Sequence, residues 1–217
     1  MNGEPSWHEP VPSRPPTASV TAVVRHPVDG WLSVATGLAF AALGPFATRT
    51  AHRAERATLS RVNGGPELQV LRLPQQLGTP WALPAVAVTA FWLRRPHLAA
   101  TSLMGIGLVQ VAEKGTKKVV RRRRPGQVLE QLVLRDDAPR SDDRSYPSGH
   151  AAKAACVAVL LVPALPGWVT AGAAATAALT AGTRVHQGAH FPLDVAGGVL
   201  MGTAVGSLCN FVVGRPG

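Results

Sequence analysis

Long apolar stretches alternate with short polar segments along the chain. Residues 30–48 form the first stretch, nineteen residues without a charge, and begin close to Trp31. At 1.5 Å per residue, such a helix approaches the thickness of a bilayer core, which is about 30 Å. A tryptophan at its start is typical of a membrane–water interface. The pattern therefore predicts a first membrane-spanning helix.

The later apolar stretches predict five more helices. Proline crowds the start of the second stretch, so we expect its regular helix to begin near Trp81. The third continues past Glu113, and the fourth, at thirty residues, is too long for one span and divides at a proline-rich turn, residues 163–167. These stretches are residues 73–93, 96–112, 154–183 and 195–213. The fold class is all-α, a polytopic membrane protein with about six transmembrane helices; a soluble helical bundle is the disfavoured alternative.

Composition supports a membrane protein. The chain is 46% hydrophobic but 16% charged, against about a quarter in soluble domains. This argues against a disordered chain and against a nucleic-acid-binding tail, despite the formal net charge of +10. Ala, Gly, Val and Leu dominate, and small residues let helices approach closely in lipid. Cys156 and Cys209 lie in apolar stretches without metal-ligand spacing, so we expect buried thiols.

The chain divides into one helical domain and two tails. Residues 1–29 are proline-rich and predict a flexible tail, residues 30–213 the six-helix domain, and residues 214–217 a short C-terminal tail. A basic segment, residues 49–72, places Arg53 and Arg56 on one helical face with Arg49, which favours a position on the membrane surface.

Three polar clusters carry candidate chemistry. They are Lys117 with Arg124-Pro125, the run Pro147-Ser148-Gly149-His150, and Arg184 with His190 and Asp194. Each has a plainer interpretation. Arg121 to Arg124 would suit a lipid-headgroup patch, Ser148 a helix N-cap, and His190 with Asp194 a local pair.

In a six-helix serpentine, these clusters fall at helix ends on the same side of the membrane. Phosphate chemistry requires such a set: cations around the phosphoryl oxygens, N–H groups at a helix N-terminus, a nucleophile and a proton donor. His150 and His190, from different loops, would supply the last two roles.

The clusters resemble the three-part signature of the type 2 phosphatidic acid phosphatase superfamily. The matching patterns are Lys117-x6-Arg124-Pro125, Pro147-Ser148-Gly149-His150 and Arg184-x5-His190-x3-Asp194, and Thr183 stands where the family commonly has serine. This group includes membrane lipid phosphatases, bacterial class A acid phosphatases and vanadium-dependent haloperoxidases.

The resemblance implies a role for each matching residue. His190 would attack phosphorus and form a phosphohistidine, Asp194 would hold its other ring nitrogen, and His150 would protonate the leaving oxygen. The phosphate ligands would be Lys117, Arg124, Ser148, Gly149 and Arg184. No metal or other cofactor is expected.

Other polar residues receive plainer roles. His186 is expected to be a surface or supporting residue, and Arg121, Arg122 and Arg123 to contact headgroups or solvent. Lys118 lacks the six-residue spacing to Arg124. Four aspartates are read as a solvated loop, with a weak divalent-ion contact left open: Asp136, Asp137, Asp142 and Asp143.

The expected substrate is a lipid phosphate or pyrophosphate, with polyprenyl pyrophosphate, phosphatidate and phosphatidylglycerol phosphate all compatible. The alternatives are phosphotransfer to a second lipid, or an anionic-lipid-binding protein without activity; a haloperoxidase is disfavoured. We expect no nucleic-acid partner and a bacterial cell membrane. Analogy with the family places the site outside the cytoplasm. The segments on the side of the site, however, carry seventeen of the twenty-two Lys and Arg residues, which favours a site that faces the cytoplasm. The membrane face and the oligomeric state stay open.

Overall fold

A computed structural model describes residues 23–47, 53–66, 70, 72–130, 132–135 and 144–216, with the backbone alone at residues 23, 215 and 216. The predicted N-terminal tail lies mostly outside these ranges, and so does the acidic loop. Residues 23 and 24 form strand β1 (Val23–Val24), which pairs with β2 (Arg215–Pro216) in an antiparallel two-stranded ribbon.

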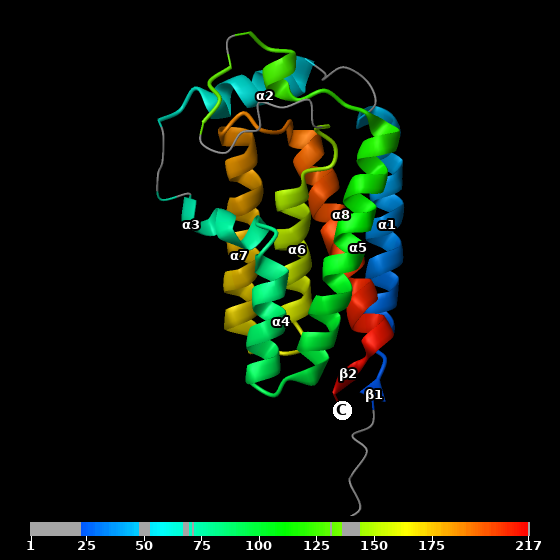
Figure 1. The fold of residues 1–217 in the computed structure, drawn as a ribbon. Coiled ribbons are helices and arrows are strands. Elements are labelled where there is room, and N and C mark those ends of the chain that lie inside the picture. The colour runs from blue at the N-terminus through cyan, green and yellow to red at the C-terminus, as the bar shows by residue number, and fades with distance from the viewer. Residues whose placement is uncertain are drawn as a thin grey trace, which may run out of the picture.

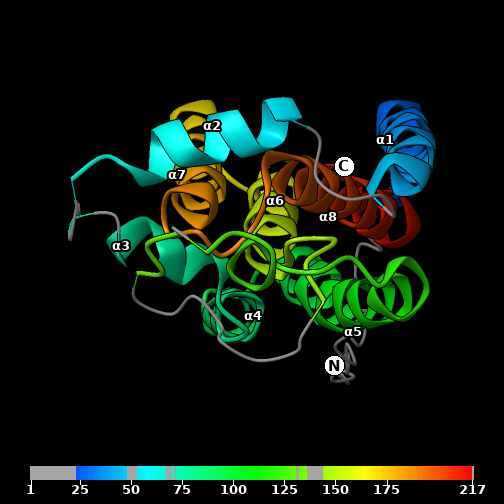
Figure 2. The ribbon, with the colours of Figure 1, turned by 90° about the horizontal axis from the view of Figure 1, so that it is seen from above.

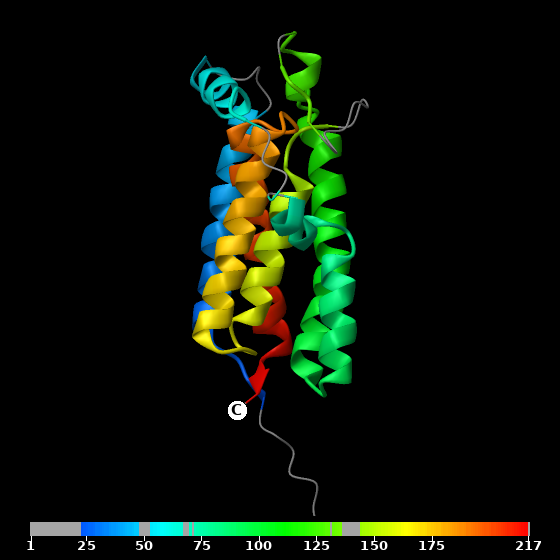
Figure 3. The same ribbon diagram turned by 90° about the vertical axis from the view of Figure 1, so that its left-hand side faces the viewer.

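Six long helices run side by side as a bundle (Figures 1 and 3). They are α1 (Pro27–Ala47), α4 (Ala82–Trp92), α5 (Pro96–Val120), α6 (Gly149–Leu161), α7 (Gly167–His186) and α8 (Pro192–Val213). The predicted all-α fold is confirmed, and the helix boundaries follow the sequence signals. Trp81 immediately precedes α4, because the prolines before it break the chain into the short helices α3 (Arg72–Gln75) and η2 (Gln76–Gly78).

The helices alternate in direction, so the α5–α6 and α7–α8 connections lie at one end of the bundle, the upper end in Figure 1. The β1–β2 ribbon lies at the opposite end. Helix α2 (Arg53–Asn63) lies across the upper end, as the view from above also shows (Figure 2). The predicted basic surface segment is thus helical over this part, and it covers the end where the polar clusters meet.

The core lies between α4, α5, α6 and α8. Its buried side chains include Leu83, Val109, Val157 and Met201. The predicted close approach of small residues is clear at Gly202, where a Cβ would overlap the backbone carbonyl of Ala152. A larger residue on α8 would therefore push this helix away from α6 and disturb the registry of the polar residues at its start.

The outer faces of the bundle carry large apolar side chains. Trp31, Trp92 and Trp168 are 74%, 78% and 79% exposed, and all three lie at helix ends opposite the polar clusters. Such a belt is typical of a membrane interface. In the described part, Pro27–Ala47 and Pro192–Val213 are long and apolar enough to cross a membrane. Six spanning segments therefore remain a prediction.

Candidate active site

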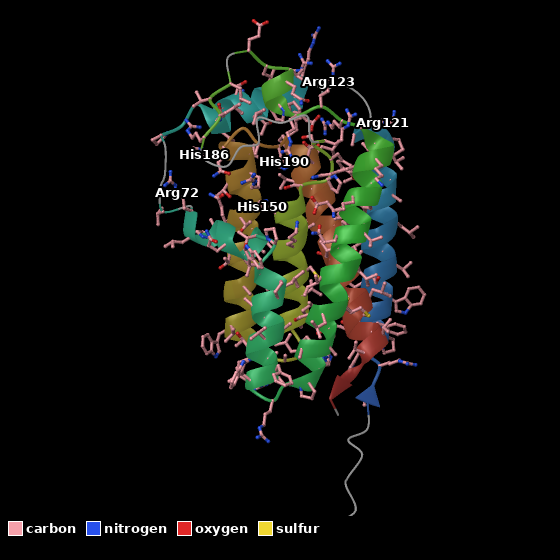
Figure 4. The ribbon with its side chains drawn as sticks, in the orientation of Figure 1. Arg72, Arg121, Arg123, His150, His186 and His190 are labelled. Carbon is pink, nitrogen blue, oxygen red and sulfur yellow. The ribbon has the colours of Figure 1, made fainter. Side chains whose placement is uncertain are left out.

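The three polar clusters meet at the upper end of the bundle. His150 lies in the first turn of α6, and His190 lies in the connection between α7 and α8 (Figure 4). A second group of buried apolar residues lies beside them and joins Leu59 of α2 to helices α6, α7 and α8: Leu59, Ala151, Ala181, Val185, Phe191 and Val195. The site is thus held on rigid helix ends and covered by a surface helix.

The geometry around His190 defines its tautomer. Its Nε2 lies 3.3 Å from Nη1 of Arg124. A guanidinium group has only N–H donors, so Nε2 must be the acceptor and carry the lone pair. The ring proton is then on Nδ1, which faces Oδ2 of Asp194 at 3.8 Å, beyond hydrogen-bonding distance.

His190 is 3% exposed, and its environment favours the neutral ring. Burial lowers the pKa of His190 from 6.5 to about 4; the charge of Arg124 acts in the same direction, and Asp194 opposes it. A neutral imidazole with an available Nε2 lone pair is the state that a nucleophilic histidine requires.

Asp194 is fully buried in the first turn of α8, and both of its oxygens are engaged. Oδ2 accepts a hydrogen bond from the backbone N–H of Phe191 at 2.8 Å and another from the hydroxyl of Ser145. Oδ1 accepts from Nη1 of Arg122 at 2.9 Å. The carboxylate is therefore locked in place beside His190.

The prediction that Arg122 contacts headgroups or solvent was wrong. Its side chain is buried between Asp194 and Glu55, whose Oε2 lies 2.7 Å from Nη2. Helix α5 ends at Val120, and the next four residues alternate between the two sides of the chain. Arg121 and Arg123 are exposed, as predicted, whereas Arg122 and Arg124 are buried. Four consecutive arginines show no alternation of residue type, so the sequence carried no signal that separates Arg122 from its neighbours.

Arg124 and Arg184 are buried in the site. Nη1 of Arg124 also donates to the carbonyl of Ala189 at 3.1 Å. Nη1 of Arg184 donates to Oε1 of Gln187 at 2.8 Å and lies 3.4 Å from Oε1 of Gln75. Neither glutamine was singled out in the sequence; both place an amide oxygen on the predicted phosphate ligand Arg184.

The second cluster forms the start of α6. Ser148 is the N-cap, and its Oγ accepts from the amide of Ala151 at 3.5 Å, so the plainer interpretation also holds. Its own N–H donates to the backbone carbonyl of Asp194 at 2.9 Å, which joins the second cluster to the third. Gly149 and His150 follow in the first turn of the helix, where backbone N–H groups favour an anion.

Lys117 is part of a charge triad that the motifs do not contain. Its Nζ lies 2.9 Å from Oε1 of Glu113, and Oε2 of Glu113 lies 2.8 Å from Nζ of Lys153. Lys153 also donates to the backbone carbonyl of Gly149 at 3.3 Å. Lys118 is exposed, which agrees with the choice of Lys117. A charge within an apolar helix was the available signal for Glu113 and Lys153.

The described residues contain no candidate metal site. Among them, no group of three or more His, Cys, Asp or Glu side chains could hold a metal ion. The four aspartates of the acidic loop lie outside the described residues. Cys156 and Cys209 are free and buried, as predicted. His186 lies outside the cluster, and its Nδ1 donates to the backbone carbonyl of Val62 at 3.0 Å.

This bundle and its polar end are those of a known class of helical proteins. The family model of the PAP2 superfamily matches residues 97–215, which include all three motifs. The chain belongs to the PAP2 superfamily, and the resemblance seen in the motifs is confirmed.

Individual relatives agree with this assignment. The undecaprenyl-diphosphatase of Sulfolobus acidocaldarius is 30% identical over 126 residues, which are 58% of this chain and 60% of the relative. The chain thus covers less than two thirds of that curated relative.

Two solved structures share the fold. Aquifex aeolicus LpxE is 25% identical with a TM-score of 0.63, over 70% of this chain and 92% of that one. The first transmembrane PAP2 type phosphatidylglycerolphosphate phosphatase from Bacillus subtilis is 24% identical with a TM-score of 0.67, over 83% of this chain and 94% of that one.

Proposed function

We propose that the protein is an integral-membrane phosphatase that hydrolyses a lipid phosphomonoester or pyrophosphate through a phosphohistidine on His190, without a metal ion. The observation that carries the proposal is the buried, neutral ring of His190, whose Nε2 lone pair faces the cation Arg124 at 3.3 Å. This contact supports the proposal, because the nitrogen that we expect to attack lies beside an arginine that we expect to bind phosphate.

In the first step, Nε2 of His190 attacks phosphorus, and the bond between phosphorus and the lipid oxygen breaks. His150 gives its proton to the leaving oxygen. The cationic charge that develops on the His190 ring is stabilised by the carboxylate of Asp194, which faces Nδ1. A phosphoryl oxygen replaces Nε2 as the acceptor for Arg124, which releases the lone pair for attack.

In the second step, water attacks the phosphohistidine. His150, now neutral, takes a proton from the water, the phosphorus–nitrogen bond breaks, and inorganic phosphate leaves. His190 returns to its neutral form and His150 to its protonated form. The cycle consumes one water molecule for each lipid phosphate.

The phosphoryl oxygens would be neutralised by fixed cations. Arg124 and Arg184 offer planar forks that suit phosphate, and Lys117 adds a point charge. The amide of Gly149 and the hydroxyl of Ser148 complete the set at the start of α6. Because Arg124, Arg184 and Ser148 are buried and already oriented, little reorganisation is needed when charge develops on the oxygens.

A lipid substrate suits the position of the site. The cluster lies at one end of a bundle whose outer faces carry exposed apolar side chains, so a lipid tail could remain in the bilayer while its phosphate reaches the site. Two of the related proteins bear names of lipid phosphatases, one for undecaprenyl diphosphate and one for phosphatidylglycerolphosphate. We place residues 30–213 in one catalytic domain, in a bacterial cell membrane.

Phosphate release by the purified protein in detergent tests this proposal. The panel would hold polyprenyl pyrophosphate, phosphatidate and phosphatidylglycerol phosphate, with a chelator present. We expect chelator-resistant release that is lost in His190→Ala and retained in the control His186→Ala, four residues upstream. Release that survives His190→Ala would contradict the phosphohistidine, and release that requires a divalent ion would contradict the metal-free mechanism. Inclusion of a lipid acceptor distinguishes transfer from hydrolysis.

A further inference from the structure

Helix α2 is fastened to the site by one carboxylate. Oε2 of Glu55, in the first turn of α2, lies 2.7 Å from Nη2 of Arg122. Its other oxygen, Oε1, accepts the backbone N–H of Leu193 at 3.2 Å. Leu193 belongs to the first turn of α8, where free N–H groups favour a negative charge. Glu55 therefore holds both Arg122 and the start of α8.

Arg122 links Glu55 to Asp194. Its Nη1 donates to Oδ1 of Asp194 at 2.9 Å, and its guanidinium lies 4.8 Å from the ring centroid of Phe191. Arg122 is 4% exposed, so both ion pairs are shielded from water. Its planar fork can satisfy two carboxylates at once, which a lysine cannot do with the same geometry.

The position of Asp194 matters because its distance from His190 is long. Nδ1 of His190 and Oδ2 of Asp194 are 3.8 Å apart, so a small movement of the carboxylate decides whether they form a hydrogen bond. Leu59 of α2 belongs to the same buried apolar group as Phe191 and Val195. This packing limits the movement of the Asp194 carboxylate.

We propose that Glu55 is a positioning residue for the nucleophile: through Arg122 and the amide of Leu193, helix α2 holds the Asp194 carboxylate against which His190 is oriented. This inference rests on the proposed role of His190. It gives the surface helix a part in the reaction, although Glu55 lies outside the three motif patterns and Arg122 stands at an unspecified position of the first.

The substitution Glu55→Gln tests the proposal. Glutamine keeps the length of the side chain and an oxygen for the Leu193 amide, but it removes the charge that partners Arg122. We expect kcat for phosphate release to fall about tenfold while KM changes by less than about twofold, because the phosphate ligands are untouched. The matched control is Glu130→Gln, the same change at an exposed position, which should leave both constants unchanged.

A double variant tests whether Glu55 acts through Arg122. If it does, Glu55→Gln combined with Arg122→Met has the same kcat as Arg122→Met alone, because both changes interrupt one chain of contacts. If Arg122→Met does not fold, Glu55→Asp takes its place, and we expect it to recover part of the lost kcat. An unchanged kcat in Glu55→Gln, even with a lower Tm, would overturn the proposal.

Amide hydrogen exchange separates this inference from the proposed function. We expect faster exchange over residues 190–194 in Glu55→Gln than in the unmodified protein or in Glu130→Gln. If the unmodified protein releases no phosphate, the proposed function fails, while equal exchange over residues 190–194 would still overturn the restraint by α2.

Discussion

The Glu113 carboxylate occupies the space that a side chain at Gly149 would require. A Cβ built on Gly149 would overlap both carboxylate oxygens of Glu113. This contact brings α5 against the first turn of α6, because the same carboxylate pairs with Lys117 and Lys153. Gly149 of the second motif thus leaves room for the Glu113 carboxylate, which in turn pairs with Lys117 of the first motif.

Gly149→Ala should therefore damage both stability and activity. The added methyl group must displace the Glu113 carboxylate, and overpacking of this kind costs about 2 kcal/mol of unfolding free energy. We expect phosphate release to fall as Lys117 loses its fixed partner. The control is Gly172→Ala on α7, where a Cβ meets nothing within 4 Å. Thermal unfolding in detergent and phosphate release check both variants, and equal behaviour of the two would contradict the overlap.

Glu113→Gln removes the carboxylate charge that pairs with the ammonium groups of Lys117 and Lys153. Because breaking one partner out of a buried ion pair leaves an uncompensated charge, we expect the unfolding free energy to fall by about 3 kcal/mol. The orientation of Lys117 should loosen as well, so KM for the lipid phosphate should rise more than kcat falls. Addition of Lys153→Met should recover part of the stability, since one unpaired cation is then gone. Denaturant unfolding and steady-state kinetics measure the two effects; a single variant as stable as the unmodified protein would argue against the triad.

The sequence predicted the helices well for physical reasons. Charge-free stretches of bilayer length and proline turns act locally, so α1 and α7 were found within a few residues of their observed boundaries, and α5 at its start. The supporting residues were not found, because their partners come from distant parts of the chain. The contact between Glu55 and Arg122, 67 positions apart, depends on how α2 lies across the bundle.

The low pKa of His190 gives a prediction for the pH dependence of kcat/KM. Burial, aided by Arg124, lowers the pKa of His190 to about 4, so its ring stays neutral well below pH 6.5. Attack on phosphorus requires the neutral ring, so the acidic limb of kcat/KM that belongs to His190 should lie near pH 4. Phosphate release measured from pH 4 to 8 checks this. An acidic limb with its midpoint near 6.5 would contradict the buried environment.

The same pKa change affects stability. In the unfolded chain His190 takes up its proton near pH 6.5, whereas in the folded protein it does so only near pH 4. The unfolded state therefore binds more protons between these values, and the unfolding free energy contributed by His190 falls as the pH drops through this window. Tm measured from pH 7 to 4 should decline less steeply in His190→Asn than in the unmodified protein. Parallel curves would show that His190 is not buried in its neutral form.

Two neighbouring arginines provide the sharpest comparison at the phosphate site. Arg124 is buried against Nε2 of His190, whereas Arg123, one residue earlier, is exposed. Arg124→Lys keeps the charge but loses the planar fork, so it can no longer bind two phosphoryl oxygens while donating to Ala189. Removing an oriented donor from a transition state typically costs about 100-fold or more in kcat, and we expect a loss of about that size for Arg124→Lys. Arg123→Lys should retain full activity, because solvent surrounds its side chain. Steady-state phosphate release on both variants tests this prediction. Similar losses in the two variants would mean that residues 121–124 act through their total charge, and would contradict the assignment of Arg124 as an individual phosphate ligand.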